Sequence, residues 1–198
     1  SPSPSPESDP KVMLELMREM EARGIGKNEY VYSAAISCCN KAGDTELALE
    51  LLSEMKERGL VPNRVVLTSA ISACAKSGWY QRALSLLAEI DQPNIINVNA
   101  ALSACEKAGQ WQPALKLLEE LKARQLQPNV VTYSACISAL AVSGRYETAL
   151  ELLKEAKDAG LTLDVVIYSA AISACAKAGQ VSHALKLLET MKQDPLVE

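Results

Sequence analysis

The segment Ala170–Gly179 reads AAISACAKAG, and close variants of it recur along the chain. The recurrences are Ser33–Gly43, Ser69–Gly78, Ala100–Gly109 and Ala135–Gly144. Their closing glycines are separated by 35, 31, 35 and 35 residues, and an Ala-Leu pair follows each glycine at the same offset. Internal similarity at such a period is typical of repeat proteins, in which each unit is one supersecondary motif.

Each repeat predicts two helices. In the first, Ile71, Cys74 and Ala75 have the i, i+3, i+4 spacing of one buried helical face. The second has an apolar stripe formed by Ala48, Leu49, Leu51, Leu52 and Met55, opposite a solvated face with Glu50, Glu54 and Glu57. A helix pair can bury both stripes only when neighbouring pairs stack on it. The expected fold class is therefore all-α, an α-solenoid of helix-turn-helix repeats of about 35 residues each.

The repeat spacing also divides the chain. Residues 1–10, which are rich in Ser and Pro, are expected to be a disordered linker. Residues 11–28 are expected to be the second helix of a partial repeat. Five full repeats follow, over residues 29–63, 64–94, 95–129, 130–164 and 165–198. Since the chain starts with this linker and without Met, we expect it to be a piece of a longer or processed protein.

Composition narrows the classes of function. The 198 residues include 20 Lys and Arg against 24 Asp and Glu, which excludes a broad cationic surface. A single His makes His-based metal sites and catalysis hard to assemble. No run approaches the roughly 18 apolar residues of a membrane span. The five predicted first helices nevertheless hold five basic residues against two acidic ones, so one face of the protein is expected to be mildly cationic.

The cysteines are expected to be packing residues. One repeat position holds Cys39, Cys74, Cys105 and Cys175, and the fourth repeat has Leu140 there. A position that accepts Leu is a core position, and no Cys-x-x-Cys pair exists, so neither a metal nor a cofactor is expected. Free thiols fit a reducing compartment. Trp79 and Trp111 lie at the starts of second helices and are expected to pack between repeats, although base stacking is the alternative.

The repeats resemble the pentatricopeptide repeat family in their 35-residue spacing, their Val-x-Tyr-Ser opening (Val131–Ser134) and their Gly-x-x-Pro-Asn ending (Gly59–Asn63). The resemblance covers nearly everything after residue 10, and the 31-residue repeat is similar to the family's short variant. The tetratricopeptide repeat is the nearest alternative, but it needs Gly within its first helix. The corresponding residues here are Ile36, Ile71, Leu102, Ile137 and Ile172.

The resemblance implies a right-handed superhelix whose first helices bind single-stranded RNA, one base per repeat. In that family, base choice is attributed to the fifth and last residues of each repeat, while the second residue packs on the bases. The implied selecting residues are Ser33, Asn63, Thr68, Asn94, Asn99, Asn129, Ser134, Asp164 and Ser169. The implied packing residues are Tyr30, Val65, Ile96, Val131 and Val166.

The family's pairing preferences imply a core RNA sequence of 5′-A-A-(C or U)-G-3′. A lysine before the turn is implied to contact RNA phosphate, and the alternative is that it stabilises the negative end of its helix. These lysines are Lys41, Lys76, Lys107 and Lys177.

The resemblance further implies a role in RNA processing, stability or translation in a mitochondrion or plastid. The His-x-Glu and Cys-x-x-Cys signature of a deaminase is absent, so the chain is not expected to be an enzyme. The alternative function is a scaffold or adaptor subunit, since solenoids offer long surfaces to protein partners.

Overall fold

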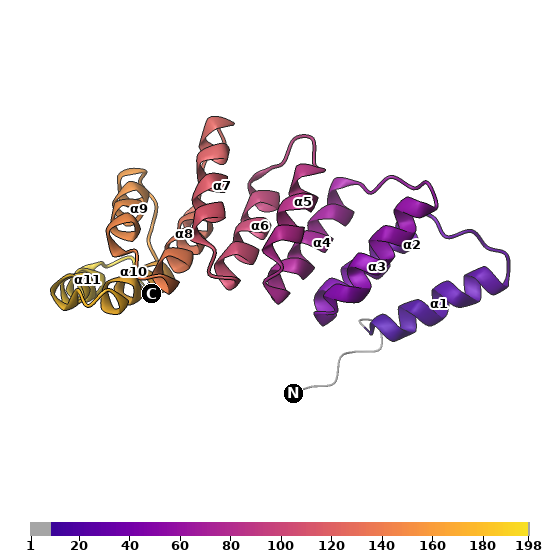
Figure 1. Cartoon of the computed structure of the whole chain (residues 1–198), viewed down its shortest axis with the longest axis horizontal. Helices are drawn as coiled ribbons and strands as arrows, with labels where there is room; N and C mark the ends of the chain where they lie inside the picture. The colour runs from indigo at the N-terminus through magenta and orange to yellow at the C-terminus, as the bar shows by residue number, and fades with distance from the viewer. Residues whose placement is uncertain (1–8, 198) are drawn as a thin grey trace. The chain divides into compact units, whose positions relative to one another are not determined.

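The computed structural model describes residues 9–197, which form eleven helices and no strand (Figure 1). The helices are α1 (Pro10–Ala22), α2 (Glu29–Ala42), α3 (Thr45–Glu57), α4 (Arg64–Ser77), α5 (Tyr80–Ala88), α6 (Ile95–Lys107), α7 (Trp111–Ala123), α8 (Val130–Val142), α9 (Tyr146–Asp158), α10 (Val165–Lys177) and α11 (Val181–Gln193). None of these helices is both long and apolar enough to cross a membrane. The all-α repeat fold expected from the periodicity is confirmed.

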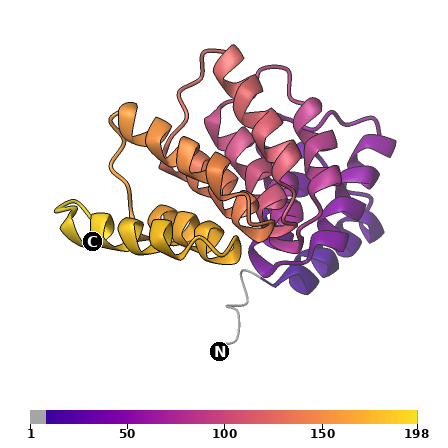
Figure 2. The ribbon, with the colours of Figure 1, turned by 60° about the vertical axis from the view of Figure 1, so that its left-hand side comes forward.

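The helices pack as stacked pairs within two compact units, Ser1–Pro93 and Asn94–Glu198. In the first unit α2 packs on α3 and α4 on α5, while α2 and α3 both contact α4. The second unit repeats this pattern, with α6, α8 and α10 as first helices and α7, α9 and α11 as their partners. Figure 2 shows α8 to α11 as neighbouring orange and yellow helices. Each second helix thus contacts its own first helix and, where one follows in the unit, the next first helix.

Helix α1 begins at Pro10, one residue before the start expected from the sequence. Asp9 accepts a hydrogen bond from the Lys11 N–H at 2.9 Å as the N-cap of α1, and Pro10 occupies the first helical position. Pro suits that position because its fixed φ is helical and its missing N–H would be unpaired there. Residues 9 and 10 therefore belong to this helix, and the expected linker over residues 1–10 extended too far. Residues 1–8 lie outside the described part of the chain.

The 31-residue repeat, residues 64–94, is shorter than the others because its second helix is shorter. Helix α5 has nine residues, whereas α3, α7 and α9 have 13 each. This difference of four equals the difference between the 35-residue and 31-residue spacings. The first helix of that repeat, α4, keeps its 14 residues. The deletion therefore leaves the first-helix side of the repeat intact.

Two features of the turn after α6 favour glycine at position 109. Gly109 follows α6 with φ +65°, a backbone conformation that side chains disfavour. A Cβ at this position would also lie 2.9 Å from Cγ1 of Val142, at the end of α8. A side chain at this position would therefore be strained by the positive φ and would displace the Val142 side chain.

The predicted packing role of the cysteine position is confirmed. Cys39 is 1% exposed, and Cys74, Cys105, Cys175 and Leu140 are 0% exposed. Burial raises the pKa of Cys74 and Cys105 to about 11, so these thiols stay neutral near pH 7. All six cysteines are buried free thiols. Their role is to fill the space between the helices.

Tyrosine–glutamate hydrogen bonds join the two helices of a repeat, and lysines of the preceding repeat pair with the same carboxylates. The Tyr32 hydroxyl donates to Glu54 at 2.8 Å, and the nearly buried Lys27 ammonium lies 2.9 Å from the same carboxylate. Burial would raise the pKa of Glu54, but the hydrogen bonds from Lys27 and Tyr32 outweigh it and lower this pKa. In the second unit, Tyr133 donates to Glu155 at 2.9 Å, and Lys122 of the preceding repeat pairs with that carboxylate.

The Arg145 guanidinium lies 3.7 Å from the Trp111 ring centroid. Since Trp111 starts α7 and Arg145 directly precedes α9, this cation–π contact joins adjacent repeats. Trp111 therefore packs between repeats, as the sequence analysis expected. Trp79 lies beside Leu49 of α3 in a shared surface hollow and is 39% exposed.

Candidate nucleic-acid interface

The second residue of every first helix is apolar and exposed to solvent. The exposed fraction is 83% for Tyr30, 63% for Val65, 65% for Ile96, 55% for Val131 and 60% for Val166. Single exposed apolar residues are common on proteins, but these five recur at one repeat position. In the second unit, three successive first helices each present such a side chain. This arrangement can provide apolar surfaces between which flat ligands stack.

The last residue of each repeat caps the following first helix. One side-chain oxygen accepts a hydrogen bond from the third backbone N–H of the helix, at 2.9 to 3.1 Å. The residues are Asn63, Asn94, Asn129 and Asp164, and Asn28 does the same for α2. The cap uses one oxygen, so each Asn keeps its amide nitrogen and Asp164 keeps its second carboxylate oxygen for other contacts.

The fifth residues differ in how far they are exposed. Ser169 is exposed, Ser33 and Thr68 are half-buried, and Ser134 is only 9% exposed. The Thr68 hydroxyl donates to the carbonyl oxygen of Arg64 at 2.6 Å. These side chains lie one helical turn after the caps and offer hydroxyl groups at partly covered positions.

One predicted selecting pair is joined directly. The side-chain nitrogen of Asn99 donates to Oδ1 of Asn129 at 3.1 Å. The hydroxyl of Thr132 lies 2.8 Å from Oδ1 of Asn99. The structure therefore brings together the fifth and last residues of the 95–129 repeat, although they are 30 positions apart in the chain. Sequence reasoning missed Thr132; the available signal was a polar residue at a repeat position where Val31, Val66 and Ile167 are apolar and only Asn97 is also polar.

The lysines before the turns are all exposed. The Lys76 ammonium donates to the carbonyl oxygen of Asn40 in the last turn of α2, where it offsets the negative helix end. No hydrogen bond or ion pair engages Lys41, Lys107 or Lys177 within the described residues. Lys76 thus stabilises the end of the neighbouring first helix and not that of its own helix, while the other three lysines offer uncommitted positive charges.

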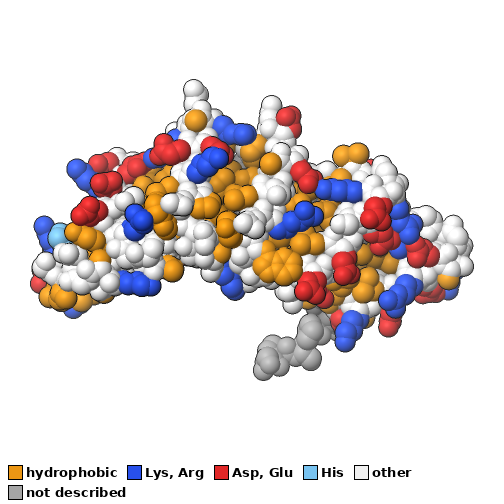
Figure 3. All heavy atoms as spheres, viewed as in Figure 1, with side chains coloured by type: hydrophobic (Ala, Val, Ile, Leu, Met, Phe, Trp, Pro, Cys, Tyr) orange, Lys and Arg blue, Asp and Glu red, His pale blue; other side chains and the backbone are white. Residues whose placement is uncertain are grey.

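Charges elsewhere on the surface are mixed. Figure 3 shows acidic and basic side chains interspersed over α1 to α3. Several of them pair across repeats, as Lys56 of α3 does with Glu89 after α5, at 2.8 Å. Such pairs neutralise charge on the second helices. The uncommitted lysines Lys41, Lys107 and Lys177 lie in the last turns of first helices, at the opposite end from the exposed apolar residue of the same helix.

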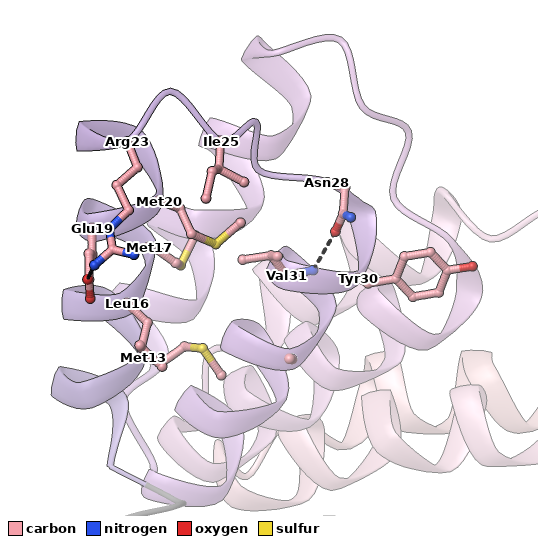
Figure 4. Close-up of a pocket in the computed structure, with 11 residues that line it drawn as sticks. Met13, Leu16, Met17, Glu19, Met20, Arg23, Ile25, Asn28, Tyr30 and Val31 are labelled. Atoms are coloured by element: carbon pink, nitrogen blue, oxygen red, sulfur yellow. Dashed lines mark hydrogen bonds and ion pairs between the residues drawn. The ribbon is translucent and has the colours of Figure 1, made fainter.

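A cavity of about 560 Å³ opens between α1 and α2 (Figure 4). Met13, Met17 and Met20 of α1 line it, together with Tyr30 and Val31 of α2. Val31 on its wall is half-buried, whereas Val66 at the same position of α4 is 1% exposed. Helix α2 packs on α4, but within the described residues no first helix precedes α2. This explains why little of the predicted apolar stripe of α1 is buried.

Comparison with protein families returns pentatricopeptide repeat models over most of the chain. A model described as a pentatricopeptide repeat domain matches residues 15–77. One described as a PPR repeat family matches residues 93–142. Two further models are each described as a PPR repeat: one matches residues 159–192, and the other matches residues 65–93 and 131–161. Comparison with curated protein sequences returns no match.

Solved structures of similar fold include the pentatricopeptide repeat protein PPR10 from maize, with a TM-score of 0.69 and 25% identity. That match covers 94% of this chain but 27% of the other. PPR10 in complex with an 18-nt psaJ RNA element matches with a TM-score of 0.70, 25% identity, and coverage of 96% and 32%. This chain thus spans a third or less of those proteins.

A third similar structure is the PPR domain of Arabidopsis thaliana protein-only RNase P 1 in complex with tRNA. Its TM-score is 0.68 at 16% identity, and the match covers 83% of this chain and 91% of that domain. At this identity, the likeness concerns the fold.

Proposed function

Because the chain belongs to the pentatricopeptide repeat family, we propose that it is a sequence-selective module that binds single-stranded RNA, one base per repeat. The observation that carries this proposal is the exposed apolar residue at the start of each first helix, next to a capping residue with an uncommitted polar group. PPR10, which has the same fold, is known in complex with an RNA element.

The apolar residues supply a surface for the flat faces of bases. In the second unit, Ile96 and Val131 start successive first helices and would flank one base, while Val131 and Val166 would flank the next. Covering these side chains would also remove apolar surface from water, at about 25 cal/mol per Å². These contacts do not depend on base identity, so they support affinity rather than selectivity.

Selectivity would come from the caps and the fifth residues. An Asn cap has its oxygen committed to the helix and presents N–H donors, whereas Asp164 presents an acceptor oxygen. The two types therefore favour bases with opposite hydrogen-bonding edges. With the pairings implied by the family, the proposed core is 5′-A-A-(C or U)-G-3′. The fifth repeat has Ser169 but no assigned partner for it.

The proposed setting is RNA processing, stability or translation in a mitochondrion or plastid, with the chain binding RNA and catalysing no reaction itself. The family supports the setting, and the single His supports the absence of a catalytic role. Buried neutral thiols are compatible with a reducing interior.

Selection of binders from random single-stranded RNA is expected to enrich the proposed core. Fluorescence anisotropy should then show tighter binding to an oligomer with this core than to one with the same bases in shuffled order. A matched DNA oligomer tests whether the 2′-hydroxyl contributes. Enrichment of unrelated sequences would contradict the base assignment, and no binding to any RNA at low salt would contradict the function.

Replacing Lys107 by Ala is expected to make RNA binding less sensitive to salt. Each phosphate contact to a single strand contributes about −0.7 to the slope of log K against log salt concentration. The slope between about 50 and 200 mM salt should therefore become shallower by about 0.7, with base preference unchanged. Lys116 is the matched control, because it is exposed on the second helix α7. Equal slopes for Lys107→Ala and the unsubstituted protein would favour the helix-end role.

An adaptor subunit is the second candidate function, and the cavity between α1 and α2 is the observation that favours it. Its methionine-rich lining is adaptable and suits an apolar partner surface. The RNA measurements separate the two functions. Stable co-purification with a protein complex, without salt-sensitive RNA binding, would favour the adaptor.

A further inference from the structure

Thr132 connects the side chains of Asn99 and Asn129. Its Oγ1 lies 2.8 Å from Oδ1 of Asn99 and 3.0 Å from Oδ1 of Asn129. Thr132 is 0% exposed at the third position of α8, whereas Asn129 is exposed at the cap of that helix. A buried hydroxyl thus supports a pair of amides at the surface.

Two backbone N–H groups determine how these side chains are oriented. The Thr132 N–H donates to Oδ1 of Asn129 at 3.1 Å, so this atom must be the amide oxygen. The Asn129 N–H donates to Oγ1 of Thr132 at 3.1 Å, so the hydroxyl proton has to point to another acceptor. Two acceptors are within reach, Oδ1 of Asn99 at 2.8 Å and Oδ1 of Asn129 at 3.0 Å, and the shorter contact is with Asn99. The Asn99 nitrogen is thereby directed toward Asn129.

In this orientation, the hydrogen-bonding groups of Asn99 and Asn129 that remain available to a ligand are mainly N–H donors. The oxygen of Asn129 already accepts from the Thr132 backbone and from Asn99, and the oxygen of Asn99 accepts from the Thr132 hydroxyl. Within residues 9–197, neither the amide nitrogen of Asn129 nor the second N–H of Asn99 donates a hydrogen bond to another group. The pair therefore presents N–H groups outward.

We propose that Thr132 is a positioning residue that makes the Asn99–Asn129 pair select cytosine over uracil, an inference that rests on the proposed function. The Watson–Crick edge of cytosine has two adjacent acceptors, N3 and O2, which match two donors. Uracil has an N3–H donor between its carbonyl groups, and this donor would face one of the amide N–H groups, which is also a donor. Of the equivalent residues in other repeats, Val31, Val66 and Ile167 are apolar, and Asn97 has an amide that accepts from the Asn94 N–H but no hydroxyl.

The test replaces Thr132 by Val, which keeps the side-chain shape and occurs naturally at this repeat position as Val66. Without the hydroxyl, the Asn99 amide can rotate and offer its oxygen to the uracil N3–H. Affinities are measured for two RNA oligomers that differ only in having C or U at the third position of the core. The unsubstituted protein should prefer C by roughly tenfold, the cost of one mismatched hydrogen bond. Thr132→Val should reduce the preference to about twofold or less.

Thr132→Ser keeps the hydroxyl and should restore the preference, which a role in packing would not explain. Ile167→Val is the control for a volume change at the same repeat position, and it should leave the C-to-U ratio unchanged. An unchanged ratio in Thr132→Val, or an equal loss of affinity for both oligomers, would overturn the positioning role while RNA binding stands. Failure of the unsubstituted protein to bind either oligomer would overturn the proposed function itself.

Discussion

Replacing Asp164 by Asn is expected to change the base preferred by the 130–164 repeat from guanine to adenine. One carboxylate oxygen of Asp164 caps α10 through the Ile167 N–H at 2.9 Å, and the second oxygen is available as an acceptor. Guanine can donate to it from N1–H and its exocyclic amine. An Asn in its place would present N–H donors, which suit N1 of adenine. Hydrogen bonds to charged groups contribute about 1.5–3 kcal/mol, so the preference should change by at least tenfold.

The substitution isolates base choice from helix stability. Asn and Asp cap helices about equally well, so the unfolding midpoint of Asp164→Asn should stay close to that of the unsubstituted protein. The reciprocal variant Asn63→Asp should move the preference of the 29–63 repeat from adenine toward guanine. Competition binding with four oligomers that differ at one position measures both changes. Continued preference of Asp164→Asn for guanine would mean that the cap does not read the base.

Replacing Leu118 by Ala is expected to cause a large loss of stability. Leu118 is 1% exposed on α7, which packs against α6 and α8. Removing such a side chain deletes buried apolar surface and leaves a cavity, at a cost of about 2–5 kcal/mol. That is a large part of the roughly 5–15 kcal/mol by which a native domain is stable. Urea unfolding followed by circular dichroism measures the change.

Leu185 provides the matched control, because it is also a leucine of a second helix but is 57% exposed on α11. Leu185→Ala should change the free energy of unfolding by no more than about 0.5 kcal/mol. Similar losses for the two variants would contradict the burial pattern of the stacked pairs.

Much of the fold could be predicted because its signals are local. The Ala-Ile-Ser-Ala-Cys pattern marks a buried helical face, and the structure buries Ile71 and Cys74 completely. The exposed apolar position was also predictable, since the family resemblance assigned Tyr30 and its equivalents to it. The start of α1 was placed too late, because Asp9 as a cap was not recognised beside the Ser-Pro run.

The orientation of the polar groups could not be predicted in the same way. Lys76 reaches a carbonyl group 36 residues earlier, and the Thr132 hydroxyl reaches an amide 33 residues earlier. Such contacts depend on how closely two first helices stack, which no local pattern reports. The sequence therefore listed candidate residues without showing which of their atoms are already used.

The sequence by itself determined the helices, their repeat period and the residue types on each face, because caps, glycine turns and apolar spacing act within a few residues. Only the tertiary structure decided which polar groups remain available on the first helices. The physical reason is that stacking brings side chains from successive repeats within hydrogen-bonding distance. Asn99, Asn129 and Thr132 show this most clearly, since their mutual contacts decide which amide atoms face outward.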